Sequence, residues 1–197
     1  MQTKLTPLLL TGLIAAMGAI PAVPALAAEQ HECSKAPVTP ASYTWNFKAE
    51  ANRTFESVAR DAAAVLDRAA RLDTFSRQPD VSWQSHGVEL DAIKARVNDM
   101  GSKLCRLETI RRVLDPWQQR EVDRIANRVQ LLADNTQDAI QYLNTYQSRL
   151  LMPAYEMYSR NLYEQADKLT HSVDNAVAYA KASHEYGKLS QKMGATT

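Results

Sequence analysis

Apolar residues recur every three to four positions through most of this chain. The first uninterrupted run comprises Leu90, Ile93, Val97, Met100, Leu104 and Leu107. The second comprises Val122, Ile125, Val129, Leu132, Thr136, Ala139, Leu143, Tyr146 and Leu150. Steps averaging about 3.5 residues keep one face of a helix apolar, and that face must pack against a partner to leave water. The pattern therefore predicts long helices packed side by side.

Proline and capping residues divide the periodic region into four segments. Pro79 stops the first helix, and Ser82 suits the N-cap of the second. Asp115 with Gln118 resembles a capping box at the start of the third. Pro153 either kinks one long helix or follows a turn, and we favour the turn because an unturned helix would exceed roughly 100 Å. The first three expected helices cover about residues 42–75, 83–114 and 116–149, and the fourth begins after Pro153.

These segments predict an all-α fold. Four helices of about 30 residues with short connections form an antiparallel up-down-up-down four-helix bundle, which we expect over residues 42–194. Residues 28–41 lack periodicity and contain Pro37 and Pro40. They predict an extended N-terminal arm.

The first 27 residues have the pattern of a secretory signal peptide. Lys4 gives a positive start, residues 8–20 are apolar, and Ala25-Leu26-Ala27 matches a cleavage site. At about a dozen residues, this apolar stretch is too short to span a bilayer comfortably. We therefore expect an exported protein, periplasmic or extracellular, that starts at residue 28 and has no stable membrane insertion after signal removal.

The charges argue against a nucleic-acid partner. The chain has 23 Lys and Arg against 22 Asp and Glu, and they alternate along the expected helices. Binding to phosphates by counterion release requires a basic surface. We therefore expect no nucleic acid among the partners.

The two cysteines, Cys33 on the arm and Cys105 on the second helix, predict a disulfide because thiols of exported proteins are usually paired. Gly101 lies one turn before Cys105 on the same face. A glycine inside a helix is about 1 kcal/mol less favourable than alanine. Either the arm fits a groove over Gly101, or a neighbouring helix packs closely there.

Aromatic residues gather at one end of the bundle if the helices alternate in direction. This candidate binding end comprises Trp83, His86, Tyr142, Tyr146, Tyr155 and Tyr158. Tyrosine and tryptophan combine apolar rings with polar tips, which suits either a binding surface or a seal over the core, and we favour the seal. His86 is either a ligand or a hydrogen-bonded histidine at the rim of the core, and we favour the second interpretation.

Residue types with chemical function do not form a known constellation. The histidines lack the spacing of a metal site, no haem attachment motif occurs, and no nucleophile has an evident base. We therefore expect no enzyme activity and no cofactor. The leading hypothesis is an exported non-enzymatic bundle that binds another protein or associates with itself in the cell envelope. The alternative is a site for a small apolar ligand or haem at the aromatic end.

Overall fold

The computed structural model describes residues 45–194, and this part of the chain consists of helices without a strand. The prediction of an all-α protein is therefore confirmed for the described range. The elements are α1 (Phe47–Phe75), α2 (Trp83–Ile110), the 3₁₀ turn η2 (Arg111–Val113), α3 (Pro116–Thr145) and α4 (Pro153–Gly194). The predicted signal peptide and the predicted arm lie outside the described residues, as does Cys33.

The starts of α1 and α2 follow capping side chains, but the start of α1 and the end of α2 differ from the expected positions. The side chain of Asn46 accepts a hydrogen bond of 3.0 Å from the backbone N–H of Ala49. This cap sets the start of α1 at Phe47, later than the expected residue 42 or 44. The hydroxyl of Ser82 accepts from the N–H of Ser85 at 3.3 Å and caps α2 as predicted. The α-helical part of α2 ends at Ile110 instead of residue 114, because the chain tightens into η2.

The third and fourth helices are separated by a turn and not by a kink. The side chain of Gln118 accepts a hydrogen bond of 3.0 Å from the N–H of Asp115, within the predicted capping box of α3. The helix ends at Thr145, earlier than the expected residue 149, and Pro153 begins α4. Because proline suits the first turn of a helix, the reversal is completed in the residues before it.

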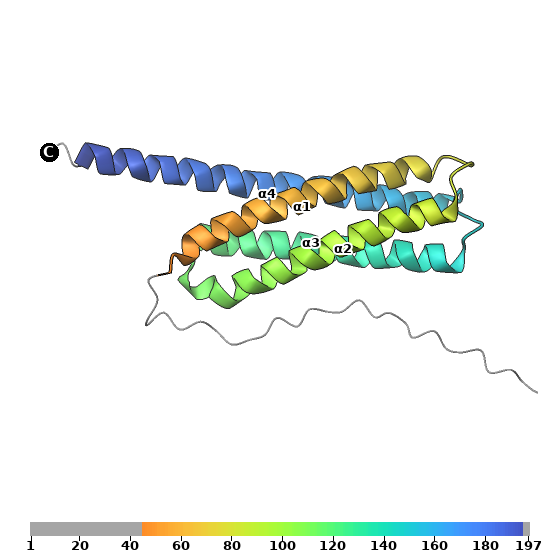
Figure 1. The fold of residues 1–197 in the computed structure, drawn as a ribbon, viewed down its shortest axis with the longest axis horizontal. Coiled ribbons are helices and arrows are strands. Elements are labelled where there is room, and N and C mark those ends of the chain that lie inside the picture. Colours follow the sequence, from red (N-terminus) through yellow and green to blue (C-terminus); the bar gives the residue numbers. More distant parts are fainter. Residues whose placement is uncertain (1–44, 195–197) are drawn as a thin grey trace, which may run out of the picture.

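Each helix packs against two others. α1 contacts α2 and α4, and α3 contacts the same two helices. The α1–α2 and α3–α4 connections lie at one end of the molecule, and the α2–α3 connection lies at the other, beside the start of α1 (Figure 1).

The apolar positions of all four helices meet in one core. The run on α2 is buried along its whole length, and the run on α3 is buried except at Tyr146, where the chain has left the helix. α1 contributes Phe55, Val58, Ala62, Val65, Ala69 and Leu72, and α4 contributes Tyr155, Leu162, Ala166, Leu169, Val173, Ala176 and Ala180.

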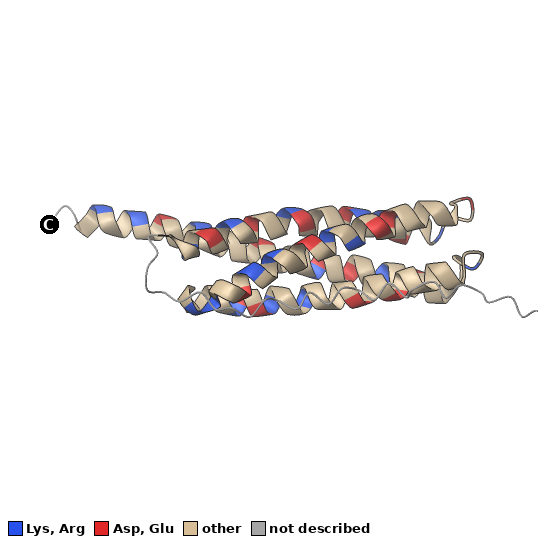
Figure 2. Cartoon of the chain, turned by 60° about the horizontal axis from the view of Figure 1, so that its bottom comes forward, with Lys and Arg blue, Asp and Glu red and all other residues tan. Residues whose placement is uncertain are grey.

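Acidic and basic side chains alternate along the helices (Figure 2), and several of them join α1 to α2. The pairs that cross between these helices include Glu50–Arg106, Asp61–Arg96, Asp61–Lys103 and Glu89–Arg68. Asp61 is buried and accepts from Arg96 at 3.1 Å and from Lys103. Burial alone lowers the pKa of Lys103, but hydrogen bonds to Asp61 and Asp99 raise that pKa on balance.

α4 is longer than its neighbours and extends beyond them. It has 42 residues where we expected about 30, and its last buried residue is Ala180. Residues 181–194, here called the tail, project past the end of the bundle (Figure 1). At a rise of about 1.5 Å per residue, the tail is roughly 21 Å long. No helix within residues 45–194 has the length and apolarity to cross a membrane.

Candidate functional site

The predicted aromatic end forms a cluster of rings around Tyr142. The centroid of its ring lies 5.0 Å from that of Tyr146, 5.6 Å from that of Tyr155 and 5.7 Å from that of Tyr158. Two of these residues come from the end of α3 and its C-cap, and two come from the first turns of α4. Tilted and offset rings at such distances are the favoured geometry of aromatic pairs. Three of the six predicted residues therefore contact a fourth, Tyr142.

His86 joins the cluster from α2. Its Nδ1 is hydrogen bonded to the hydroxyl of Tyr155 at 3.0 Å, and both side chains are at most 1 % exposed. Phe75 at the end of α1 packs edge-on against the imidazole at 5.7 Å between centroids. Burial lowers the pKa of His86 and raises the pKa of the Tyr155 hydroxyl, because the charged form of each group loses its hydration. The geometry matches a hydrogen-bonded histidine at the rim of the core.

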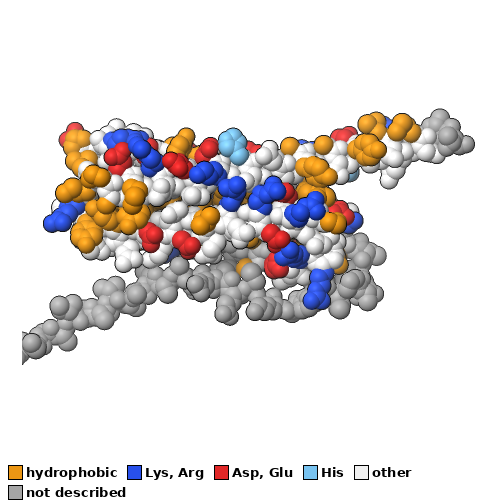
Figure 3. Space-filling view, turned by 180° about the vertical axis from the view of Figure 1, so that it is seen from behind, with side chains coloured by type: hydrophobic (Ala, Val, Ile, Leu, Met, Phe, Trp, Pro, Cys, Tyr) orange, Lys and Arg blue, Asp and Glu red, His pale blue; other side chains and the backbone are white. Residues whose placement is uncertain are grey.

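Around this buried layer lies a set of exposed apolar side chains. Trp83 is one of these exposed side chains, and it forms none of the ring contacts described above. The set, here called the apolar rim, comprises Trp83, Tyr146, Leu151, Met152 and Met157, each between 40 % and 56 % exposed. Hydrophobic side chains gather on this end in the space-filling view (Figure 3). The guanidinium carbon of Arg149 lies 5.9 Å from the centre of the Tyr146 ring, a cation–π distance.

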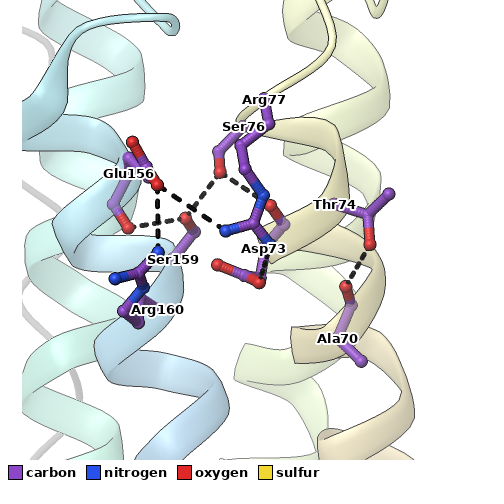
Figure 4. A network of polar contacts seen from close by, with 8 residues as sticks. All are labelled: Ala70, Asp73, Thr74, Ser76, Arg77, Glu156, Ser159 and Arg160. Carbon is purple, nitrogen blue, oxygen red and sulfur yellow. Dashed lines mark hydrogen bonds and ion pairs between the residues drawn. The ribbon is translucent and has the colours of Figure 1, made fainter.

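A polar junction beside the aromatic cluster was not predicted. The hydroxyl of Ser159 on α4 donates to the hydroxyl of Ser76 at 3.0 Å, and Ser76 donates to the carbonyl oxygen of Asp73 at 2.8 Å (Figure 4). Both serines are buried. Arg77 pairs with Glu156 of α4 at 3.6 Å and also with Asp73. These contacts hold the end of α1 against the start of α4. No sequence signal links serines 83 positions apart.

The opposite end of the bundle is closed by Trp117. Its ring centroid lies 4.8 Å from that of Tyr179 on α4 and 6.2 Å from that of Phe55 on α1. The buried side-chain amide of Gln118 donates to the carbonyl oxygen of Lys48 at 3.0 Å and to the side chain of Asn52 at 2.8 Å. This end is therefore tied together by both apolar and polar contacts.

Cys105 lies half-buried on α2. The predicted partner Cys33 lies outside the described residues, so the disulfide stays a prediction. A Cβ atom placed on Gly101 would meet no atom of the described chain within 4 Å. The expectation that a neighbouring helix packs closely on Gly101 is therefore wrong for the helices of the bundle, and the groove for the arm stays a prediction.

The polar positions inside the helices have local partners. The hydroxyl of Thr136 is buried and donates to the carbonyl oxygen of Leu132 at 2.7 Å, one turn earlier. Asp134 accepts from Gln130 at 2.9 Å on an exposed face. Between residues 45 and 194, no three His, Cys, Asp or Glu side chains are grouped so that they could hold a metal ion.

The apolar rim thus places exposed apolar side chains beside the buried pair His86 and Tyr155. Tyrosine, tryptophan and methionine are residue types that protein interfaces favour. We compared the chain with protein-family models, curated proteins and solved structures, and none of them matches it.

Proposed function

We propose that this chain is an exported, non-enzymatic helical protein that binds another protein through the apolar rim. The observation that carries the proposal is the exposure of five large apolar side chains at one end of the bundle. Contiguous exposed apolar side chains mark interaction sites more often than isolated ones do.

The buried layer beneath the rim supports this assignment. The hydrogen bond between His86 and Tyr155 and the stacked tyrosines fix the positions of the elements that carry the rim. A preorganised surface loses little conformational entropy on binding, so more of its contact energy appears as affinity. In this proposal the buried rings seal the end of the core, and the apolar rim beside them binds the partner.

A site for a small apolar ligand or haem has less support. The Nδ1 of His86 already bonds to Tyr155, and the imidazole is enclosed between Phe75 and Tyr155. A ligand would have to displace these contacts. The absorbance spectrum of the protein purified from its native host tests this alternative directly.

We also propose the finer architecture, an antiparallel up-down-up-down bundle preceded by the arm, with Cys33 paired to Cys105. The packing of each helix against two neighbours supports the bundle. The open space over Gly101 and the half-buried Cys105 one turn later support the arm. Mass spectrometry of the secreted protein before and after reduction tests both export and pairing. We expect an N-terminus at residue 28 and a gain of two hydrogens on reduction.

Partner binding is tested by comparing two single substitutions of exposed leucine. Leu151→Glu places a charge in the apolar rim, and Leu131→Glu places the same charge on an exposed position of α3 away from it. Each variant is immobilised and exposed to the envelope fraction, and bound proteins are quantified. We expect the wild type and Leu131→Glu to retain the same partner protein in similar amounts. The amount of this partner bound to Leu151→Glu should be lower by at least about tenfold. Equal retention by all three proteins would contradict the proposal.

A further inference from the structure

The surroundings of His86 favour the neutral form of its imidazole. His86 lies in the first turn of α2, where the partial positive charge of the helix N-terminus disfavours a cation. Its ring is enclosed by the rings of Phe75 and Tyr155, and the side chain is 1 % exposed. The hydroxyl of Tyr155 bonds to one ring nitrogen only, whereas an imidazolium donates from both. The site therefore fits an uncharged ring.

The other titratable and charged groups of the helix ends around His86 do not compensate a positive charge on it. Two are phenols, those of Tyr142 on α3 and Tyr155 on α4. The others are members of ion pairs with arginine, namely Glu89–Arg68, Asp73–Arg77, Arg77–Glu156 and Glu156–Arg160. The connections at this end add Asp80 and Arg149, and both are exposed. Within residues 45–194, no carboxylate forms an ion pair with His86.

His86 and Tyr155 also connect the two helix starts that carry most of the apolar rim. Trp83 is the first residue of α2 and lies one turn before His86. On the other side, the carbonyl oxygen of Met152 accepts from the N–H of Tyr155 at 2.9 Å, and Met157 follows two residues later. The hydrogen bond of 3.0 Å between His86 and Tyr155 thus links the turn that carries Trp83 to the turn that carries both methionines.

We propose that His86 and Tyr155, here called the latch, make partner binding sensitive to acid. When His86 takes up a proton from the solvent, its ring leaves the space between Phe75 and Tyr155 to reach water, and the start of α2 separates from the start of α4. The two sides of the apolar rim then no longer form one surface, and the partner is released. This inference rests on the proposed function, because it describes how binding by the same rim is regulated.

The pH range follows from the two states of the histidine. In the open form the imidazole is hydrated and has the ordinary pKa of about 6.5, whereas burial lowers the pKa of His86 in the closed form. The open form therefore binds the proton more tightly, and acid raises its population. The ratio of open to closed molecules increases by up to about tenfold for each pH unit below about 6.5, until the pH reaches the lowered pKa.

Hydrogen exchange measured by mass spectrometry at about pH 5 and about pH 7.5 tests the latch without any partner. Each rate is divided by the rate of an unfolded peptide at the same pH, because the exchange chemistry itself depends on pH. We expect the protection of residues 87–90 and 157–160 to be at least about fivefold lower at the acidic pH. Residues 120–125, at the start of α3 and the other end of the bundle, should keep their protection. Equal losses at both ends, or no loss at the aromatic end, would overturn the inference.

His86→Gln separates the latch from other effects of acid. Glutamine can still bond to Tyr155 but does not titrate, so protection of the aromatic end should differ by less than about twofold between the two pH values. His171→Gln removes an exposed histidine of α4 and should keep the response of the wild type. An acid response that His86→Gln retains in full would show that another group is responsible.

Tyr155→Phe provides a second variant if circular dichroism shows that His86→Gln has lost its helices. It keeps the histidine and removes the hydroxyl that meets it. The aromatic end should then be less protected than in the wild type at about pH 7.5 and should still lose protection in acid. Wild-type protection in this variant at both pH values would contradict the latch.

Partner retention connects the latch to the apolar rim. The immobilised wild type, His86→Gln and His171→Gln are each exposed to the envelope fraction at both pH values, and the bound proteins are quantified. We expect the wild type and His171→Gln to retain at least about twofold less of the partner at about pH 5, and His86→Gln to retain similar amounts at both. An equal acid response of all three proteins would refute the regulation. Absence of any partner at about pH 7.5 would refute the proposed function alone, because the exchange measurements still decide whether the latch opens.

Discussion

At the scale of single residues, His86 and Tyr155 form a hydrogen bond between two fully buried side chains at the aromatic end. Both groups have lost their hydration, and their bond of 3.0 Å replaces it. A satisfied hydrogen bond makes only a modest net contribution to the free energy of unfolding. A buried polar atom that loses its partner, however, destabilises the fold by about 1–3 kcal/mol.

Tyr155→Phe should therefore lower the free energy of unfolding by about 1–3 kcal/mol, because it leaves the Nδ1 of His86 buried without a partner. Tyr158→Phe removes the same atom from a less buried member of the cluster and should change stability by less than about 0.5 kcal/mol. Urea denaturation of both variants measures the difference. Equal losses would show that the hydroxyl of Tyr155 is not specifically required.

The lowered pKa of His86 predicts a pH dependence of stability. Burial holds this pKa below the ordinary value of about 6.5, which applies to the unfolded chain. Between the two pKa values, the unfolded chain binds a proton that the folded protein does not. The free energy of unfolding should therefore fall as the pH falls below about 6.5.

The measurement is the free energy of unfolding by urea at several pH values between 5 and 8. His86→Gln removes the titrating group, and its curve should be flatter over this range whatever its absolute stability. His171→Gln is the control because His171 is exposed. If His86→Gln retains the slope of the wild type, another group is responsible.

The sequence located His86 at the rim of the core but did not identify its partner. The apolar period of α2 determines which face His86 occupies. Tyr155 lies 69 positions away, and its contact with His86 depends on how the ends of α2 and α4 align in space. The contact between Ser76 and Ser159 was not predicted for the same reason, because it also depends on how two distant segments align in space. Side-chain pairs between distant segments are decided by tertiary register, which a local pattern does not contain.

At the scale of elements, α1 and α2 are joined by ion pairs that cross between them, and the central one is the most buried. Asp61 faces two cations of α2, and its carboxylate is almost fully buried. Lys103 also donates a hydrogen bond to the neighbouring Asp99, and this bond is the main cause that lowers the pKa of Asp99. A buried acceptor with two charged donors contributes more than an exposed pair does.

Asp61→Asn should destabilise the protein by about 1–2 kcal/mol, because it removes the charge that Arg96 and Lys103 share while their own exposure limits the loss. Asp67→Asn is the matched control, since Asp67 forms an exposed ion pair with Arg71 within α1. That variant should lose no more than about 0.5 kcal/mol. Thermal unfolding monitored by circular dichroism compares the two. A similar loss in both would mean that the burial of Asp61 has no energetic consequence.

Substitution of Gly101 on α2 tests whether the arm crosses this face, because the two cases predict changes in stability of opposite sign. If the arm crosses Gly101, Gly101→Ala should destabilise the oxidised protein, because the added methyl group meets the arm. In a Cys33→Ser background, the same change should stabilise by up to about 1 kcal/mol through helix propensity. Gly187→Ala in the exposed tail is the control and should have the same sign in both backgrounds. Stabilisation by Gly101→Ala in both would remove the arm from this face.

The number and type of elements could be predicted because the signals are local. Proline, the serine N-cap and the capping box mark three boundaries, and the apolar period identifies the buried face of every helix. The early end of α3 was missed because its turn contains no glycine, and the seven residues before Pro153 give no other signal. The length of α4 was missed for a different reason: the apolar period continues to Met193, but periodicity does not show where the neighbouring helices end.

At the scale of the whole molecule, stability is distributed unevenly between the bundle and the tail. Every helix of the bundle buries one face, whereas residues after Ala180 bury none. Isolated helices of about 12–15 residues are marginally stable in water, so the tail should open far more often than the core.

Limited proteolysis with trypsin should therefore cleave first at Lys181, Lys188 or Lys192 and leave residues 47–180 intact for much longer. Mass spectrometry of the products identifies the sites. First cleavage within α1–α3 would contradict this distribution of stability.

The apolar rim and the tail lie at opposite ends of one continuous helix, because α4 starts beside the rim and leaves the bundle at the far end. At a rise of about 1.5 Å per residue, its 42 residues hold the two ends roughly 63 Å apart. A molecule that contacts one end therefore leaves the other accessible, and the two ends can be occupied at the same time.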